Sequence, residues 1–66
     1  MQAHIKLKAW LMTRKLRQGD LAQMVGVTEA AVSEWINDKR KPSRESAYRI
    51  ERVTDEYVKQ GDWSNE

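Results

Sequence analysis

Hydrophobic residues recur every three or four positions along most of this 66-residue chain, a spacing typical of amphipathic helices. Residues 4–16 and 18–25 carry the pattern first, followed by a segment that begins near Thr28 and by residues 43–57. Residues 59–66 are polar apart from Trp63. The pattern predicts an all-α fold of four short helices, or five if the last segment is also helical.

The apolar positions within each segment share a helical face and form the predicted core. They are Leu7, Trp10 and Leu11 with the stem of Arg14, then Leu21, Ala22 and Val25, then Val32, Trp35 and Ile36, and finally Ala47, Ile50, Val53 and Tyr57. With 39% hydrophobic residues and no cysteine, the chain can build one modest core, and no disulfide supports it. One domain is therefore expected.

Only Gly26, Val27 and Thr28 separate the second helical segment from the third. Gly26 can end a helix because glycine readily adopts a positive φ, and Thr28 can cap the next helix. Two helices joined so closely cannot lie antiparallel and must cross at a steep angle, with the small Ala22 where they meet. This is the helix-turn-helix arrangement, which projects its second helix into the major groove of DNA.

The charged residues are segregated along the chain, which the formal net charge of +2 conceals. Residues 1–17 carry five basic residues and no acidic one, and residues 39–44 carry four basic residues and no acidic one. From residue 51 onward, five acidic residues outnumber two basic ones. Two separate basic clusters favour a polyanionic partner.

Taken together, these features resemble the phage repressor and Cro family of helix-turn-helix regulators. The matching positions are Gln18, Ala22, Gly26, Val27, Val32 and Trp35, followed by the basic loop and proline of NDKRKPS. The segments AAVSEW and AYRIERVT are similar to Cro-type proteins of lambdoid phages and prophages, and the resemblance covers residues 7–54. It implies a lambda-repressor-like fold whose DNA-recognition helix begins near Thr28.

The chain departs from the family pattern at two places. Many relatives pair an arginine of the first helix with a glutamate after the aromatic residue of the third, where this chain has Leu11 and Ile36. Apolar residues often replace a buried ion pair without loss of stability, so the fold is still expected. Relatives usually carry glycine where this chain has Asp38, so a turn of different shape is expected after the third helix.

The resemblance also implies which residues contact DNA. On the recognition helix these are Thr28, Glu29, Ala30, Ala31, Ser33, Glu34 and Asn37. Beside it, phosphate contacts are assigned to Arg17, Lys39, Arg40, Lys41 and Arg44, and Gln18 is expected to contact a phosphate or to orient a neighbouring side chain of the recognition helix. The recognition helix carries two acids and no base, so the flanking cations must supply the affinity. Its carboxylates can accept from a cytosine amino group, and its alanines suit thymine methyl groups.

A single short recognition helix reads only a few base pairs, so a homodimer on DNA is expected. The domain of residues 1–56 commits its helix-turn-helix face to DNA, and its basic first helix would repel a copy of itself. Residues 57–66 are therefore interpreted as a tail. Tyr57, Val58 and Trp63 form the predicted dimer contact, and packing of Trp63 on its own core is the alternative.

The sequence predicts a transcriptional repressor that occupies a double-stranded DNA operator in the cytoplasm. An antitoxin that binds a protein toxin and regulates its own operon is an alternative with the same fold. No enzyme is expected, because the chain has one histidine, no cysteine and no glycine-rich phosphate loop. No metal, cofactor, small-molecule ligand or membrane is expected either, since His4 stands alone and the apolar runs are short.

Overall fold

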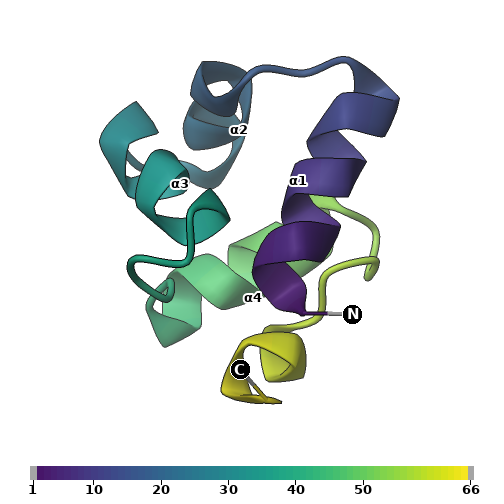
Figure 1. Ribbon diagram of the computed structural model, residues 1–66, viewed down its shortest axis with the longest axis vertical. Helices are drawn as coiled ribbons and strands as arrows, with labels where there is room; N and C mark the ends of the chain where they lie inside the picture. The colour runs from purple at the N-terminus through teal and green to yellow at the C-terminus, as the bar shows by residue number, and fades with distance from the viewer. Residues whose placement is uncertain (1, 66) are drawn as a thin grey trace.

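The computed structural model describes residues 2–65, and over that range it contains helices and no strand (Figure 1). The elements are α1 (Ala3–Arg14), α2 (Gln18–Val25), α3 (Glu29–Ile36), α4 (Arg44–Val53) and the 3₁₀-helix η1 (Gln60–Asn65). α2 packs against α3 and α4, while η1 packs against α1 and α4. Within residues 2–65, no helix has the length and apolar character needed to cross a membrane. The all-α prediction is confirmed.

One hydrophobic core lies where the four α-helices and η1 meet. Its buried residues are Ala3, Leu7, Trp10, Leu11, Leu21, Ala22, Val25, Val32, Trp35, Ile36, Ala47, Ile50, Val58 and Trp63. Every apolar residue predicted for the core of the first three segments is among them. Leu11 and Ile36, which replace the ion pair of many relatives, are both buried here. The guanidinium of Arg14 lies 5.5 Å from the centre of the Trp10 ring and covers the edge of the core.

α1 ends at Arg14, two residues earlier than predicted. Lys15 adopts the left-handed conformation with φ of 58°, and its N–H donates to the carbonyl of Met12 at 3.2 Å. The N–H of Leu16 donates to the carbonyl of Leu11 at 2.9 Å. Together these bonds form the Schellman arrangement that satisfies the last carbonyls of a helix. Leu16 then packs against the core, which directs the chain toward α2.

The turn between α2 and α3 has the geometry that the sequence predicts. Gly26 is left-handed with φ of 83°, and the N–H groups of Gly26 and Val27 both donate to the carbonyl of Ala22, at 2.8 and 2.9 Å. The hydroxyl oxygen of Thr28 accepts a hydrogen bond from the N–H of Ala31 at 3.1 Å, which caps α3. Ala22 is buried beneath the turn, where its small side chain lets the two helices approach closely.

Arg49 of α4 supports this turn from outside. Its guanidinium donates one hydrogen bond to the carbonyl of Val25 (3.0 Å), the last residue of α2, and another to the carboxylate of Glu45 (2.7 Å). A Cβ atom at Gly26 would lie 3.1 Å from the Nη1 atom of Arg49. Position 26 therefore favours glycine for two reasons, its positive φ and the space that Arg49 occupies.

α4 ends at Val53, so the prediction of a helix through residue 57 is wrong. Asp55 and Glu56 both adopt the left-handed conformation, with φ of 54° and 68°. Two such residues in succession cannot continue a right-handed helix. Tyr57 therefore leaves the face that it was predicted to share with the core residues of α4, and it is 45% exposed.

The segment after α4 returns to the core instead of leaving the domain as a tail. The buried Thr54 donates its hydroxyl to the carbonyl of Ile50 (2.8 Å) and accepts a hydrogen bond from the N–H of Val58 (3.1 Å). Val58 is fully buried and Trp63 is 4% exposed. The predicted dimer contact is corrected for these two residues, because their side chains are already packed in the protein's own core. Tyr57 alone of the three presents substantial surface.

An ion pair joins η1 to α1. The ammonium of Lys6 lies 3.1 Å from the carboxylate of Asp62, which also accepts a hydrogen bond from the N–H of Lys59 at 2.9 Å. Burial on its own would raise the pKa of Asp62, but these two donors outweigh it and hold the pKa below its ordinary value. The charged form of Asp62 therefore stabilises the contact between the first and last helices.

Candidate nucleic-acid interface

α3 has one face in the core and one face turned away from it. Val32, Trp35 and Ile36 are buried. The residues predicted to contact DNA from this helix all lie wholly or partly at the surface: Thr28, Glu29, Ala30, Ala31, Ser33, Glu34 and Asn37. α3 lies at one edge of the molecule, with α2 above it and α4 below it in the view of Figure 1. An exposed helix at the edge of a fold can enter a groove of DNA.

Two polar side chains of the exposed face bond to one another along the helix. The side-chain amide of Asn37 donates to the carbonyl of Ser33 at 2.9 Å and to its hydroxyl oxygen at 3.3 Å. Asn37 directly follows the last residue of α3, so its amide satisfies one of the carbonyls that a helix end leaves open. The amide nitrogen of Asn37 is therefore engaged with Ser33 of its own helix.

The two acidic residues of α3 have different surroundings. A carboxylate oxygen of Glu34 lies 3.6 Å from the guanidinium of Arg40, in the loop after the helix. No ion pair of the described residues involves Glu29. Its carboxylate lies beside Gly19, where an added Cβ atom would be 3.4 Å from Oε1 of Glu29.

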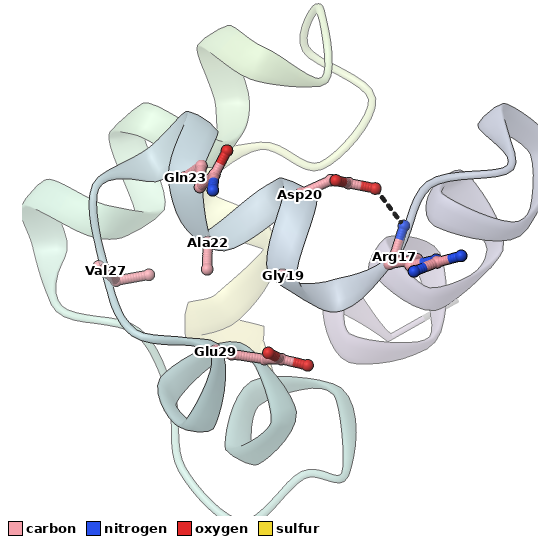
Figure 2. Close-up of a pocket in the computed structure, with 7 residues that line it drawn as sticks. All are labelled: Arg17, Gly19, Asp20, Ala22, Gln23, Val27 and Glu29. Atoms are coloured by element: carbon pink, nitrogen blue, oxygen red, sulfur yellow. Dashed lines mark hydrogen bonds between the residues drawn. The ribbon is translucent and has the colours of Figure 1, made fainter.

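Glu29 extends along a hollow of about 460 Å³ between the first turn of α2 and the start of α3 (Figure 2). Arg17 and Asp20 line the side formed by α2, and the carboxylate of Asp20 accepts a hydrogen bond from the N–H of Arg17 at 2.9 Å. The N–H groups of Gln18 and Gly19 belong to the first turn of α2, where no earlier helical carbonyl can accept them. Such N–H groups can bind a phosphate.

The basic residues after α3 are exposed, and they lie around the start of α4. Arg40 and Lys41 line a second hollow, of about 300 Å³, which Ala31 of α3 also lines. Arg44 lines a different hollow, between α4 and η1, which Lys41 also lines. The structure therefore places cations at the C-terminal end of α3 and, through Arg17, beside its N-terminal end.

The turn after α3 contains a left-handed residue. Asp38 has φ of 58°, a conformation that glycine adopts more readily than other residues. This explains physically why glycine would suit the position. The carboxylate of Asp38 lies 3.8 Å from the imidazole of His4, which brings the start of α1 close to this turn.

Sequence reasoning missed two residues that position α3. Arg49 bonds to a carbonyl 24 residues away, and no local pattern signals such a contact. Gly19 lies beside Glu29, and an added Cβ atom there would lie 3.4 Å from Oε1 of Glu29, in van der Waals contact. A signal for Gly19 was present, because glycine is unfavourable inside a helix and its occurrence there indicates another constraint.

Residues 7–58 of the chain match the helix-turn-helix family. Comparison with curated proteins and with solved structures gives no match. The matched segment is more than half of the chain, and it contains the crossing of α2 and α3, the exposed face of α3 and the basic loop that follows. The chain therefore belongs to the helix-turn-helix family of DNA-binding transcription regulators.

Proposed function

We propose that this protein is a transcriptional repressor of the Cro type, which acts by occupying a DNA operator. α3 enters the major groove of double-stranded DNA, and the bound protein denies RNA polymerase access to the promoter. This mechanism requires binding alone, without catalysis or a cofactor.

The observation that carries the proposal is the separation of charge around α3. The helix with its caps contains two acidic residues and no basic one, whereas Lys39, Arg40 and Lys41 follow it directly. Arg17 stands beside its other end, at the start of α2. Phosphate contacts fix a protein on DNA, and base contacts read the sequence. The arrangement suits both tasks, because the cations flank a helix face that is open to the bases.

The proposal includes a second copy of the protein on the same operator. Paired recognition helices of this kind read half-sites about one helical turn apart, which gives the sequence information that one short helix lacks. Of the three residues predicted to form the contact between copies, Tyr57 is the one that is exposed. A contact this small would leave the free protein monomeric and let the copies pair on DNA.

Salt dependence of binding tests the proposal, with an operator selected from a random pool of duplexes. Four to six neutralised phosphates per subunit give a slope of roughly −4 to −5 in a plot of log affinity against log salt concentration. We expect Lys39→Ala to weaken binding to every sequence by a similar factor and to make the slope shallower by about one.

Lys59→Ala is the matched control, because Lys59 is also exposed but precedes η1, which packs against α1 and α4. This variant is expected to keep the slope of the wild-type protein. A wild-type slope near zero would refute DNA binding by the basic flanks. Equal slopes for all three proteins would show that Lys39 does not contact phosphate.

A further inference from the structure

Few side chains of α3 are able to donate hydrogen bonds to DNA bases. Residues 28–37 include no Arg, Lys or Gln. The amide nitrogen of Asn37, at the far end of the helix, donates to the carbonyl and the hydroxyl oxygen of Ser33. The hydroxyls of Thr28 and Ser33 each have a single O–H donor, and their oxygens already accept a bond within the helix. The exposed face is therefore poor in donors.

Because α3 presents few hydrogen-bond donors, it is poorly suited to recognise purine bases. Guanine presents two acceptors in the major groove and is normally read by the donors of Arg or Lys, whereas adenine presents an acceptor and a donor and is read by Asn or Gln. Residues 28–36 contain no Arg, Lys, Asn or Gln, so no side chain before Asn37 offers either pair. The groups that these residues present at the surface are two hydroxyls, carboxylates, which only accept hydrogen bonds, and methyl groups.

Glu29 is better placed than Glu34 to use a base as its partner. Glu34 already lies 3.6 Å from Arg40, whereas no ion pair within residues 2–65 involves Glu29. A carboxylate that enters the major groove loses water, and only a new hydrogen bond offsets that cost. The carboxylate of Glu29 lies beside Gly19 at the start of α2, and the exposed Ala30 follows Glu29 directly.

We propose that Glu29 reads a cytosine by accepting a hydrogen bond from its N4 amino group, and that Ala30 contacts the C5 side of a neighbouring pyrimidine. Adenine also has an amino donor, but its N7 acceptor lies beside that group and repels a carboxylate. Cytosine has a C–H group at the equivalent place. The inference rests on the proposed function, because it requires α3 to lie in the major groove. It adds the class of base that the helix selects.

Selection of duplexes from a random pool tests the assignment with Glu29→Gln, which keeps the size of the side chain and adds a donor. A glutamine can accept from N6 and donate to N7 of adenine. We expect one position of the half-site to change from C to A on the same strand, with a change in preference of about tenfold or more. The control is Glu56→Gln, which alters an exposed glutamate after α4 that takes part in no ion pair of the described residues, and it is expected to select the wild-type sequence.

A second measurement uses the wild-type protein on chemically modified DNA. In a base pair with guanine, N4-methylcytosine carries its methyl group on the side of the amino nitrogen that faces the major groove. There the methyl group replaces the N–H that would donate a hydrogen bond to Glu29. We expect this modification at the selected cytosine to weaken binding about tenfold or more. Methylation at C5 keeps the amino group, and it is expected to leave binding unchanged or to strengthen it.

The outcomes separate this inference from the proposed function. A clear operator that Glu29→Gln leaves unchanged, or affinity that is indifferent to N4-methylation, would overturn the role of Glu29 while DNA binding stands. A pool in which the wild-type protein enriches no sequence would overturn both. The change from C to A together with the loss on N4-methylation would support the assignment.

Discussion

Replacing Gly26 by alanine tests whether two separate constraints hold the turn between α2 and α3. The first is the backbone, because Gly26 has φ of 83°, and a left-handed conformation costs other residues about 1–2 kcal/mol. The second is space, because the new Cβ atom would lie 3.1 Å from Nη1 of Arg49. That nitrogen also donates to the carbonyl of Val25 at 3.0 Å, so Arg49 cannot move away without lengthening this hydrogen bond.

The expected magnitude follows from these two terms. A hydrogen bond from a charged donor contributes about 1.5–3 kcal/mol when well buried. The side chain of Arg49 is half exposed, so water replaces part of the loss, and we use about 1 kcal/mol for the displaced bond. Gly26→Ala should then lower the free energy of unfolding by about 2–3 kcal/mol. For a domain of this size, such a loss lowers Tm by roughly 10–20 °C.

Urea unfolding followed by circular dichroism measures the effect in a double-mutant cycle with Arg49→Met, which keeps most of the apolar stem. In the double variant the hydrogen bond to Val25 is already absent, so Gly26→Ala adds only its backbone cost. The combined loss should fall short of the sum of the single losses by about 1 kcal/mol. Gly61→Ala is the control, since no atom lies within 4 Å of its added Cβ, and it should change stability by no more than about 0.5 kcal/mol. Additivity of the cycle to within about 0.5 kcal/mol would refute the steric part of the reasoning.

Two further predictions concern stability and use the same urea assay. Asp38→Gly should raise the free energy of unfolding by about 0.5–1 kcal/mol, because glycine removes the left-handed strain at φ of 58°. A loss of stability would instead show that the contact of Asp38 with His4 is worth more than the strain. Trp63→Ala should cost about 3–5 kcal/mol, since the ring is buried in the core. The free energy of unfolding of Trp63→Phe should stay within about 1 kcal/mol of the wild-type value, because the indole N–H that this substitution removes is buried without a partner in the described structure. Equal losses of stability for the two Trp63 variants would contradict this account.

The parts of the fold that depend on neighbouring residues could be predicted from the sequence. α2 spans Gln18–Val25 as predicted, and Gly26 ends it in the left-handed conformation. Thr28 caps α3 through the N–H group three residues later. These interactions join residues close together in the chain, so the pattern of apolar, capping and glycine positions contains the information.

The helix ends that lack glycine could not be predicted in the same way. Lys15, Asp38, Asp55 and Glu56 are all left-handed, although each of these residue types pays a steric cost there. Local preference does not indicate such positions, because backbone hydrogen bonds formed by the turn compensate for the strain. This is why the predicted helices at residues 4–16 and 43–57 were both too long.

Contacts between distant parts of the chain were missed for a related reason. Lys6 and Asp62 are 56 positions apart, and their pairing depends on the path of the whole chain. The segment that contains Val58 and Trp63 is too short and too polar to show a helical pattern, so its burial was not predictable from periodicity. For α3, the sequence predicted which residues are exposed. The sequence did not predict the hydrogen bond from the Asn37 amide to Ser33, which reduces the hydrogen-bond donors that α3 can offer to DNA.

Residues 28–37 contain no cationic side chain. In the proposed binding mode, the contacts between α3 and the bases therefore release no counterions from the DNA. The ions released on binding come from the phosphates that the flanking residues touch, and these phosphates are chemically alike on every DNA. Raising the salt concentration should therefore weaken binding to the operator and to unrelated DNA in parallel, and the ratio of the two affinities should stay nearly constant. Inside a cell, a rise in ionic strength would reduce how often the operator is occupied but not how well it is distinguished from the rest of the genome.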